Sequence, residues 1–216
     1  MIEDQEYGYI VNVNYHVNLY GNNLISIDVK FNEIKGNFDC SVNLLKSLKG
    51  SPKIVNGNFF CYVNELTNLK GGPEKVTGYF DCSENYLKTL EGAPKIIQLS
   101  FDCNFNQLKT LEYFPQVLKS ISCSCNKLTS LKGIPKVING SFDCSNNLLE
   151  TLENCPEIIG KTLNFSKNKI KVLYDCRYSA ISCNTQLKLY FLRFVFYIFW
   201  IFLITFIFCI NEYYTP

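Results

Sequence analysis

The sequence predicts a solenoid of stacked repeats, because residues of three kinds recur with one shared period along most of the chain. The cysteines follow one another at intervals of 21, 21, 21, 20 and 21 residues: Cys40, Cys61, Cys82, Cys103, Cys123 and Cys144. One column of prolines and one of asparagines keep the same intervals, including the single short one. This shared irregularity indicates structural units of nearly constant length and not a bias in composition.

Apolar residues fill each unit at fixed offsets, so that it reads F-x-C-x-x-N-x-L-x-x-L-x-G-x-P-x-x-V-x-G. Phenylalanine and cysteine alternate with polar residues, which predicts a short strand with both side chains in the core. Stacked units then form a parallel sheet. We interpret the cysteines as small buried apolar side chains, because Leu19 and Phe165 occupy the same slot in the end units.

The asparagine column is predicted to be structural. The chain turns after each strand and leaves backbone groups without partners in the sheet, and a side-chain amide can both donate to and accept from them. The column comprises Asn43, Asn64, Asn85, Asn106, Asn126, Asn147 and Asn168.

The segment that follows each proline is predicted to be extended or irregular, since proline stops a helix and few residues remain in the unit. An apolar residue three positions after each proline is expected to point inward: Val55, Val76, Ile97, Leu118, Ile138 and Ile159. Gly36, Gly57, Gly78 and Gly140 stand four residues before a cysteine and predict a turn with positive φ. The 20-residue unit has no such glycine, so we expect its missing residue at that place.

The unit resembles the leucine-rich repeat family, whose core pattern is L-x-L-x-x-N-x-L-x-x-L. Phe38, Cys40, Asn43, Leu45 and Leu48 fill those slots in the first clear unit. The resemblance covers residues 17–174 and implies about eight repeats with a parallel β-sheet on a concave side. The short unit with its proline is similar to repeats of bacterial effector proteins, and its phenylalanine and cysteine content resembles repeat families of large DNA viruses and phages.

The two ends of the chain depart from the repeat. Residues 1–16 are predicted to form an N-terminal cap strand, and residues 175–188 a degenerate repeat or linker. Residues 189–210 are predicted to form a hydrophobic transmembrane helix followed by a short tail, 211–216, since 17 uncharged residues run from Phe194 to Ile210. Basic residues precede this segment and none follows it, which predicts a tail-anchored protein with cytosolic repeats. A hydrophobic cap on the last repeat and the product of a frameshift stay open as alternatives.

Composition argues against several classes of function. A net charge of +2 gives no basic surface for nucleic acid, and the acidic first residues do not form a signal peptide, so reduced thiols are expected. No segment outside the repeats is long enough for a catalytic domain, and His16, the single histidine, has no nearby ligands. We therefore expect a monomeric protein that is not an enzyme and that needs no cofactor or metal.

Residues that flank the inward phenylalanine and cysteine are predicted to line the open face of the sheet. Aspartates that stack there repel one another, which a basic partner or a cation would relieve. Exposed aromatic residues are frequent anchors at interfaces. The candidate partner-binding residues are Asp39, Phe60, Tyr62, Tyr79, Asp81, Asp102, Asn104 and Asp143.

The expected function is a non-enzymatic protein–protein interaction module in a membrane, with a protein partner that the sequence does not identify. A plainly hydrated, aggregation-resistant face is the alternative for the candidate residues. A soluble, host-directed viral or bacterial repeat protein is the alternative for the whole chain.

Overall fold

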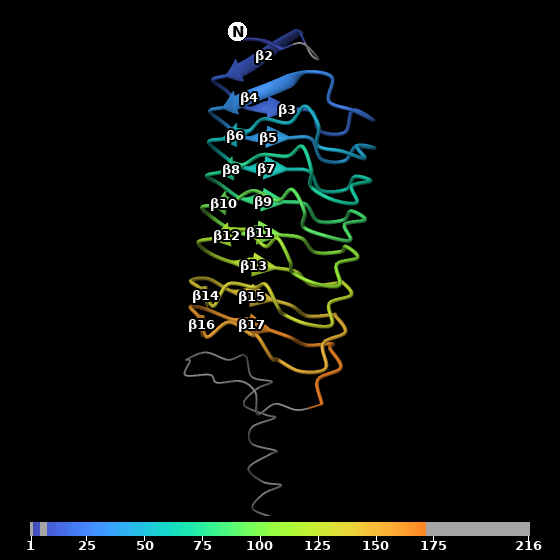
Figure 1. Ribbon diagram of the computed structural model, residues 1–216, viewed down its shortest axis with the longest axis vertical. Helices are drawn as coiled ribbons and strands as arrows, with labels where there is room; N and C mark the ends of the chain where they lie inside the picture. The colour runs from blue at the N-terminus through green and yellow to red at the C-terminus, as the bar shows by residue number, and fades with distance from the viewer. Residues whose placement is uncertain (1, 5–7, 172–216) are drawn as a thin grey trace, which may run out of the picture. The chain divides into compact units, whose positions relative to one another are not determined.

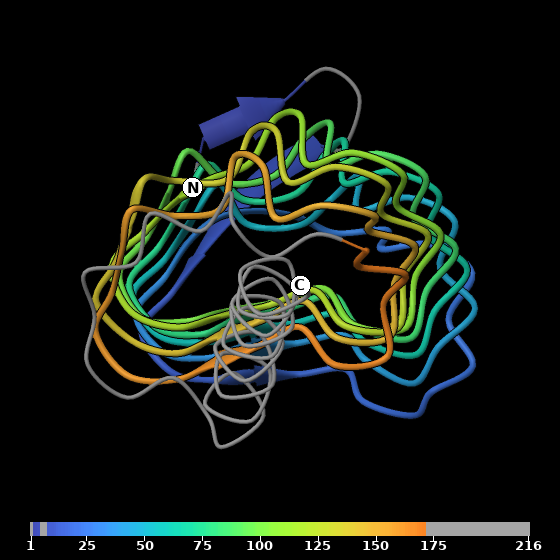
Figure 2. The ribbon, with the colours of Figure 1, turned by 90° about the horizontal axis from the view of Figure 1, so that it is seen from below.

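A computed structural model describes residues 2–4 and 8–171, and every structural statement below concerns these residues. They wind into a parallel β-solenoid of about seven stacked turns (Figure 1). The repeat solenoid predicted from the sequence is thereby confirmed. Viewed along the stacking direction, successive turns superpose, so that each repeat position forms a column (Figure 2).

One ladder of strands contains the Phe-x-Cys segments. It is an eight-stranded parallel sheet in which equivalent residues pair, as Phe59 does with Phe80. Its strands are β3 (Val17–Asn18), β5 (Phe38–Asp39), β7 (Phe59–Phe60), β9 (Phe80–Asp81), β11 (Phe101–Asp102), β13 (Ile121–Ser122), β15 (Phe142–Asp143) and β17 (Leu163–Asn164).

The return segments are extended, as predicted. They also pair into a second ladder, which was not predicted from the sequence. Its seven-stranded sheet holds β1 (Ile2–Asp4), β2 (Gly8–Val13), β4 (Lys30–Ile34), β6 (Ile54–Val55), β8 (Lys75–Val76), β10 (Ile96–Ile97) and β12 (Gln116–Val117). Strands β14 (Val137–Ile138) and β16 (Ile158–Ile159) pair separately. Only β1 and β2 pair antiparallel among these strands, so the predicted N-terminal cap is a short hairpin followed by a parallel partner, β4.

The core consists of columns of like side chains. The phenylalanine rings stack on their counterparts, with ring centroids 5.4 Å apart for Phe38–Phe59 and 5.2 Å for Phe59–Phe80. The cysteines of the repeat are fully buried and unpaired, which confirms them as apolar core residues. Burial raises the pKa of the Cys61, Cys82 and Cys103 thiols well above its usual range, so these sulfurs stay protonated and unreactive.

The inward residue of the short unit was wrongly predicted. Leu118 is 43% exposed, whereas Val117 is buried and pairs with Ile97 of the preceding turn. The unit therefore lacks a residue between Pro115 and Val117. Its missing residue does not explain the missing glycine, because the glycine slot is present and holds Lys119.

The conformation predicted for the glycine column was also wrong. Gly36, Gly57, Gly78 and Gly140 do not have positive φ. These positions have no room for a side chain, because the neighbouring turn approaches closely. A Cβ on Gly78, for example, would lie 2.1 Å from Oδ1 of Asn58. Positive φ occurs instead at the glycine two residues after the second leucine, for example 90° at Gly92.

The predicted linker, transmembrane helix and tail, residues 175–188, 189–210 and 211–216, lie outside the described residues. In the part of the chain that the structure describes, no helix combines the length and the apolar character needed to cross a bilayer.

Candidate partner-binding face

The ladder asparagines fix where each strand of the β3–β17 sheet ends. Nδ2 of Asn85 donates to the carbonyl oxygens of Cys61, Cys82 and Ser83 at 3.0, 3.3 and 3.1 Å. Its Oδ1 accepts from the backbone N–H of Leu66 at 3.0 Å. Each such amide therefore joins its own turn to the preceding one, and the same pattern recurs at Asn64, Asn106, Asn126 and Asn147. The end members Asn43 and Asn168 make equivalent bonds.

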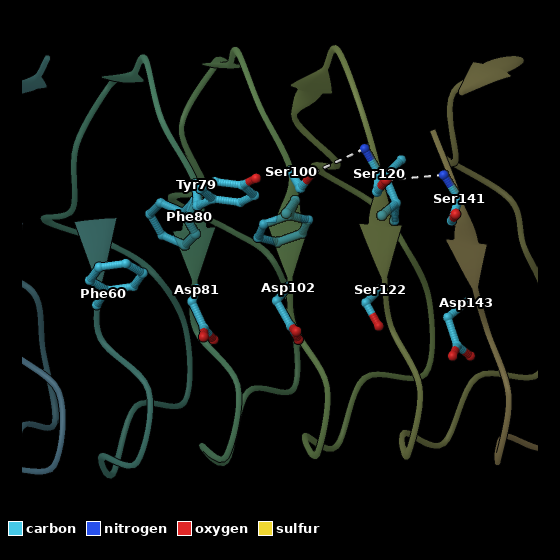
Figure 3. Close-up of a pocket in the computed structure, with 12 residues that line it drawn as sticks. Phe60, Tyr79, Phe80, Asp81, Ser100, Asp102, Ser120, Ser122, Ser141 and Asp143 are labelled. Carbon is cyan, nitrogen blue, oxygen red and sulfur yellow. Dashed lines mark hydrogen bonds between the residues drawn. The ribbon is translucent and has the colours of Figure 1, made fainter. Parts of the chain in front are cut away.

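A single row of side chains runs across the outer face of this sheet, one from each strand from β5 to β17. The pairing register sets Asp81 beside Asp102, and Ser122 beside Asp143 (Figure 3). We call this row the aspartate row: Asp39, Phe60, Asp81, Asp102, Ser122, Asp143 and Asn164. All its members are partly exposed.

Local hydrogen bonds orient the carboxylates. Oδ1 of Asp81 accepts from the backbone N–H of Ser83 at 2.9 Å and from its hydroxyl at 2.6 Å, and Asp143 binds Ser145 in the same way. At Asp102 the two oxygens accept from the backbone N–H and the side-chain amide of Asn104, at 2.9 and 3.1 Å. These bonds hold the carboxylates at the ends of the strands, where they face solvent and one another.

A second polar column lies two residues before the aspartate row, and sequence reasoning did not identify it as a ladder. The Ser120 N–H donates to Oγ of Ser100 at 3.2 Å, and the Ser141 N–H donates to Oγ of Ser120 at 3.0 Å (Figure 3). His16 is the first member of this column in the N-terminal turns, and its Nδ1 accepts from the Asn37 N–H at 2.8 Å. The recurring small polar residue three positions before the cysteine was the available signal.

The aspartate row and the serine column border one hollow of about 370 Å³. Phe60 and Tyr79 lie at one end of it, and the carboxylates lie along one side (Figure 3). Of the predicted residues it brings together Phe60, Tyr79, Asp81, Asp102 and Asp143. Ser100, Ser120, Ser122 and Ser141 also line it and were not among the candidates.

Three predicted residues do not line the hollow. Asp39 lies two strands from Asp81, where Oδ1 accepts from the backbone N–H of Ser41 at 3.0 Å. Tyr62 meets Phe60 edge to face, with ring centroids 6.4 Å apart, and so extends the aromatic end. Asn104 links neighbouring turns, since its Oδ1 accepts from the Ser122 and Ser124 hydroxyls at 2.8 and 2.9 Å.

The hollow favours positive charge. Burial raises the pKa of Asp102 to about 6, and repulsion from Asp81 and Asp143 adds to this, while the hydrogen bond from the Asn104 N–H opposes it. A cation in the hollow would relieve the repulsion and favour ionised Asp102. Within the described residues, no group of three or more histidine, cysteine, aspartate or glutamate side chains has the arrangement of a metal site.

Comparison of the chain with protein-family models, with curated proteins and with solved structures finds no match.

Proposed function

We propose that the chain is a non-enzymatic interaction module that binds a basic, extended segment of a protein partner on the outer face of the β3–β17 sheet. The observation that carries this proposal is the hollow in which aromatic rings and oriented carboxylates converge. Both the charge and the apolar surface of this hollow favour a basic side chain.

Asp81 and Asp102 are neighbours in the aspartate row. Strands in a sheet lie about 4.8 Å apart, so these carboxylates repel each other at short range in a partly dehydrated site. Both hydrogen bonds at Asp81 go to Oδ1, so Oδ2 can accept from an incoming ammonium or guanidinium group. A lysine or arginine side chain would offset the repulsion between the two carboxylates and would also donate to Oδ2 of Asp81.

Phe60 and Tyr79 supply the aromatic surface of the hollow. Lysine and arginine carry long apolar stems that pack on aromatic rings while their charged ends reach a polar group. Tyr79 is 47% exposed, which makes its ring accessible to such a stem. A ring next to a carboxylate therefore selects a basic side chain over a short acidic or apolar one.

We propose further that the solenoid is of the leucine-rich repeat type. The support is the position of the ladder asparagine, which in each repeat follows the strand and bonds two successive turns. Residues 189–210 are proposed to anchor the protein in a membrane with the repeats on the cytosolic side. Deleting residues 189–216 should make the protein extractable from membranes by high salt, which removes surface-bound protein, whereas the full chain should resist extraction. Equal resistance of both chains would remove the anchor, and a full chain found in the soluble fraction would favour the soluble alternative.

The partner-binding proposal is tested with a library of labelled ten-residue peptides in which lysine and arginine are either present or replaced by glutamine. Basic members should bind the full chain, and the double variant Asp81→Asn with Asp102→Asn should bind them about tenfold more weakly or worse. Asparagine fits these slots, because Asn164 already accepts from the Ser166 N–H and hydroxyl at 3.2 and 2.8 Å.

The matched control is Glu112→Gln with Glu153→Gln, which removes equal charge from exposed positions away from the hollow. Its affinity for the basic peptides should equal that of the wild type. Equal weakening by both double variants would show a general charge effect, and equal binding of glutamine peptides would remove basic selectivity; either result overturns the proposal.

A further inference from the structure

The outer face of the second ladder has a different chemistry from the aspartate row. On both sides of its inward column, residues point away from the core, and several of them are exposed aliphatic side chains. The exposed fractions are 36% for Ile54, 37% for Ile96, 43% for Leu118, 45% for Val137 and 53% for Ile158. They come from the turns of β6, β10, β12, β14 and β16, whereas the turn of β8 has Lys75 in the slot of Ile54. Exposed aliphatic groups that gather on one side of a protein mark a surface that binds a membrane or a partner.

Lysines neighbour these aliphatic side chains in the sequence or across the ladder, where Lys75 pairs with Ile54 on one side and with Ile96 on the other. The basic–aliphatic face comprises the exposed lysines Lys35, Lys53, Lys75, Lys95, Lys119, Lys136 and Lys161 together with the aliphatic residues just named. Its acidic residues are fewer: Glu33, Glu74 and Glu157. Glu157 is paired with Lys136, with Nζ to Oε1 at 2.9 Å, and Glu33 accepts from Nδ2 of Asn56 at 2.7 Å. The face is therefore positive, although the whole chain carries a net charge of only +2.

We propose that this basic–aliphatic face docks on the surface of a bilayer that contains anionic lipids. Lysines adjacent to a membrane are attracted by anionic headgroups, and aliphatic side chains between them are stabilised when they enter the boundary between headgroups and acyl chains. A nucleic acid or an acidic protein surface complements the lysines but not a series of exposed isoleucine, leucine and valine side chains. The inference concerns a different side of the coil from the aspartate row and does not depend on the proposed partner.

Docking in this way leaves the aspartate row on another side of the coil. The two ladders form separate sides of each turn (Figure 2). A protein held by its basic–aliphatic face thus keeps its acidic hollow away from the anionic lipid that would repel it.

The test follows lysine acylation in the full chain, site by site, by mass spectrometry. The protein is mixed with vesicles of phosphatidylcholine alone or of phosphatidylcholine with phosphatidylserine. Phosphatidylserine should slow the acylation of Lys53 and Lys95 at least about fivefold, from the strength of lysine–headgroup attraction, and leave Lys109 and Lys132 unchanged. High salt should remove the difference, because it screens exposed charges.

This design separates the face from the hydrophobic C-terminal segment, which does not require anionic lipid. Protection that is equal on neutral and anionic vesicles, or that is equal at Lys95 and Lys109, overturns the proposal. So does protection of the lysines by a DNA duplex or heparin as strong as that by the anionic vesicles, because it would reveal a polyanion site.

Two variants test the two components of the face. Lys53→Glu with Lys95→Glu should weaken the phosphatidylserine-dependent part of vesicle binding by about tenfold or more. Ile54→Ser with Ile96→Ser should weaken it severalfold, since it removes only apolar contact. The control, Lys109→Glu with Lys132→Glu, should bind like the wild type. Full binding by the isoleucine variant would show that no apolar group enters the bilayer and would overturn docking as proposed. Circular dichroism verifies that each variant is folded.

Discussion

At the scale of the residue, the ladder asparagine is the side chain that satisfies the most buried backbone groups in each repeat. Asn85 is 5% exposed, and one side chain there satisfies three carbonyl oxygens and one N–H of the backbone. Asn85→Ala should lower the free energy of unfolding by about 3 kcal/mol or more, because several buried backbone groups lose their partners together. Urea denaturation measures this. Asn56→Ala, at an exposed position, should change stability by about 0.5 kcal/mol or less. A similar loss in both variants would remove the structural role from the ladder.

Asp102 makes the protein sensitive to pH. Its pKa in the folded chain is raised to about 6 from 3.8, so the folded state binds a proton more tightly than the unfolded chain. This group therefore favours folding most at pH below its unfolded pKa, and that contribution is lost as pH rises through about 6. Asp102→Asn removes the dependence. The variant should gain stability relative to the wild type as pH rises from 3.8 to about 6, the range between the two pKa values, and the difference should stay constant above it. Parallel urea midpoints across this range would contradict it.

The affinity for a basic segment should also depend on Asp102, but it should rise with pH, whereas the contribution of Asp102 to stability falls. A basic segment binds the ionised carboxylate, so its affinity for the hollow should fall as pH drops through about 6. Peptide titrations at several pH values measure this, with Asp102→Asn as the variant in which most of the pH dependence disappears.

At the scale of the element, contact between neighbouring turns decides where side chains are allowed. A Cβ on Gly78 would lie 2.1 Å from Oδ1 of Asn58 and 2.6 Å from the backbone of Gly57. Gly78→Ala should therefore cost about 2 kcal/mol or more, since backbone has to move. Gly21→Ala, with nothing within 4 Å but a φ of +66°, should cost about 1 kcal/mol. A milder effect at Gly78 than at Gly21 in thermal or urea denaturation would show that the turns yield easily.

The repeat period was sufficient to predict the stacked turns, the inward phenylalanine, cysteine and leucine columns, and the extended return segments. It was not sufficient for features that depend on the distance between turns. Gly78 and Gly92 are both recurring glycines, and only coordinates distinguish one that is small because of a close neighbour from one that needs positive φ. Similarly, Val117 and Leu118 are both apolar, and the choice between them depends on where the short unit lost a residue.

The candidate partner-binding face was also predicted only in part. Strand alternation was enough to group Phe60, Asp81 and Asp102 on one side of the sheet. The hollow and its serines were not predicted, because a serine is unremarkable in sequence until its hydroxyl is seen to accept from the next turn. Positive φ before each ladder asparagine was also missed, since the slot holds residues as different as Val63, Glu84 and Phe105.

At the scale of the whole molecule, each turn of the solenoid depends on its neighbours and not on distant turns. Removal of residues 64–84, which joins Val63 to Asn85, deletes one whole unit of 21 residues and keeps every column in register. The shortened chain should retain its circular dichroism spectrum and unfold at a lower urea concentration. Removal of residues 64–74 alone breaks the register at that turn, so the turns on its two sides should unfold separately and the urea transition should broaden or split. Equal behaviour of the two deletions would contradict nearest-neighbour stacking.

The column of buried cysteines has a consequence for the fate of the chain when it opens. While the turns stay stacked, no oxidant reaches these sulfurs, and their high pKa keeps them from attacking one another. Once heat or force separates the turns, thiols that stand 20 or 21 residues apart in the chain become accessible and can be oxidised to disulfides in many combinations. A brief opening in oxidising surroundings would then become permanent damage, whereas in reducing surroundings the same chain would simply wind up again.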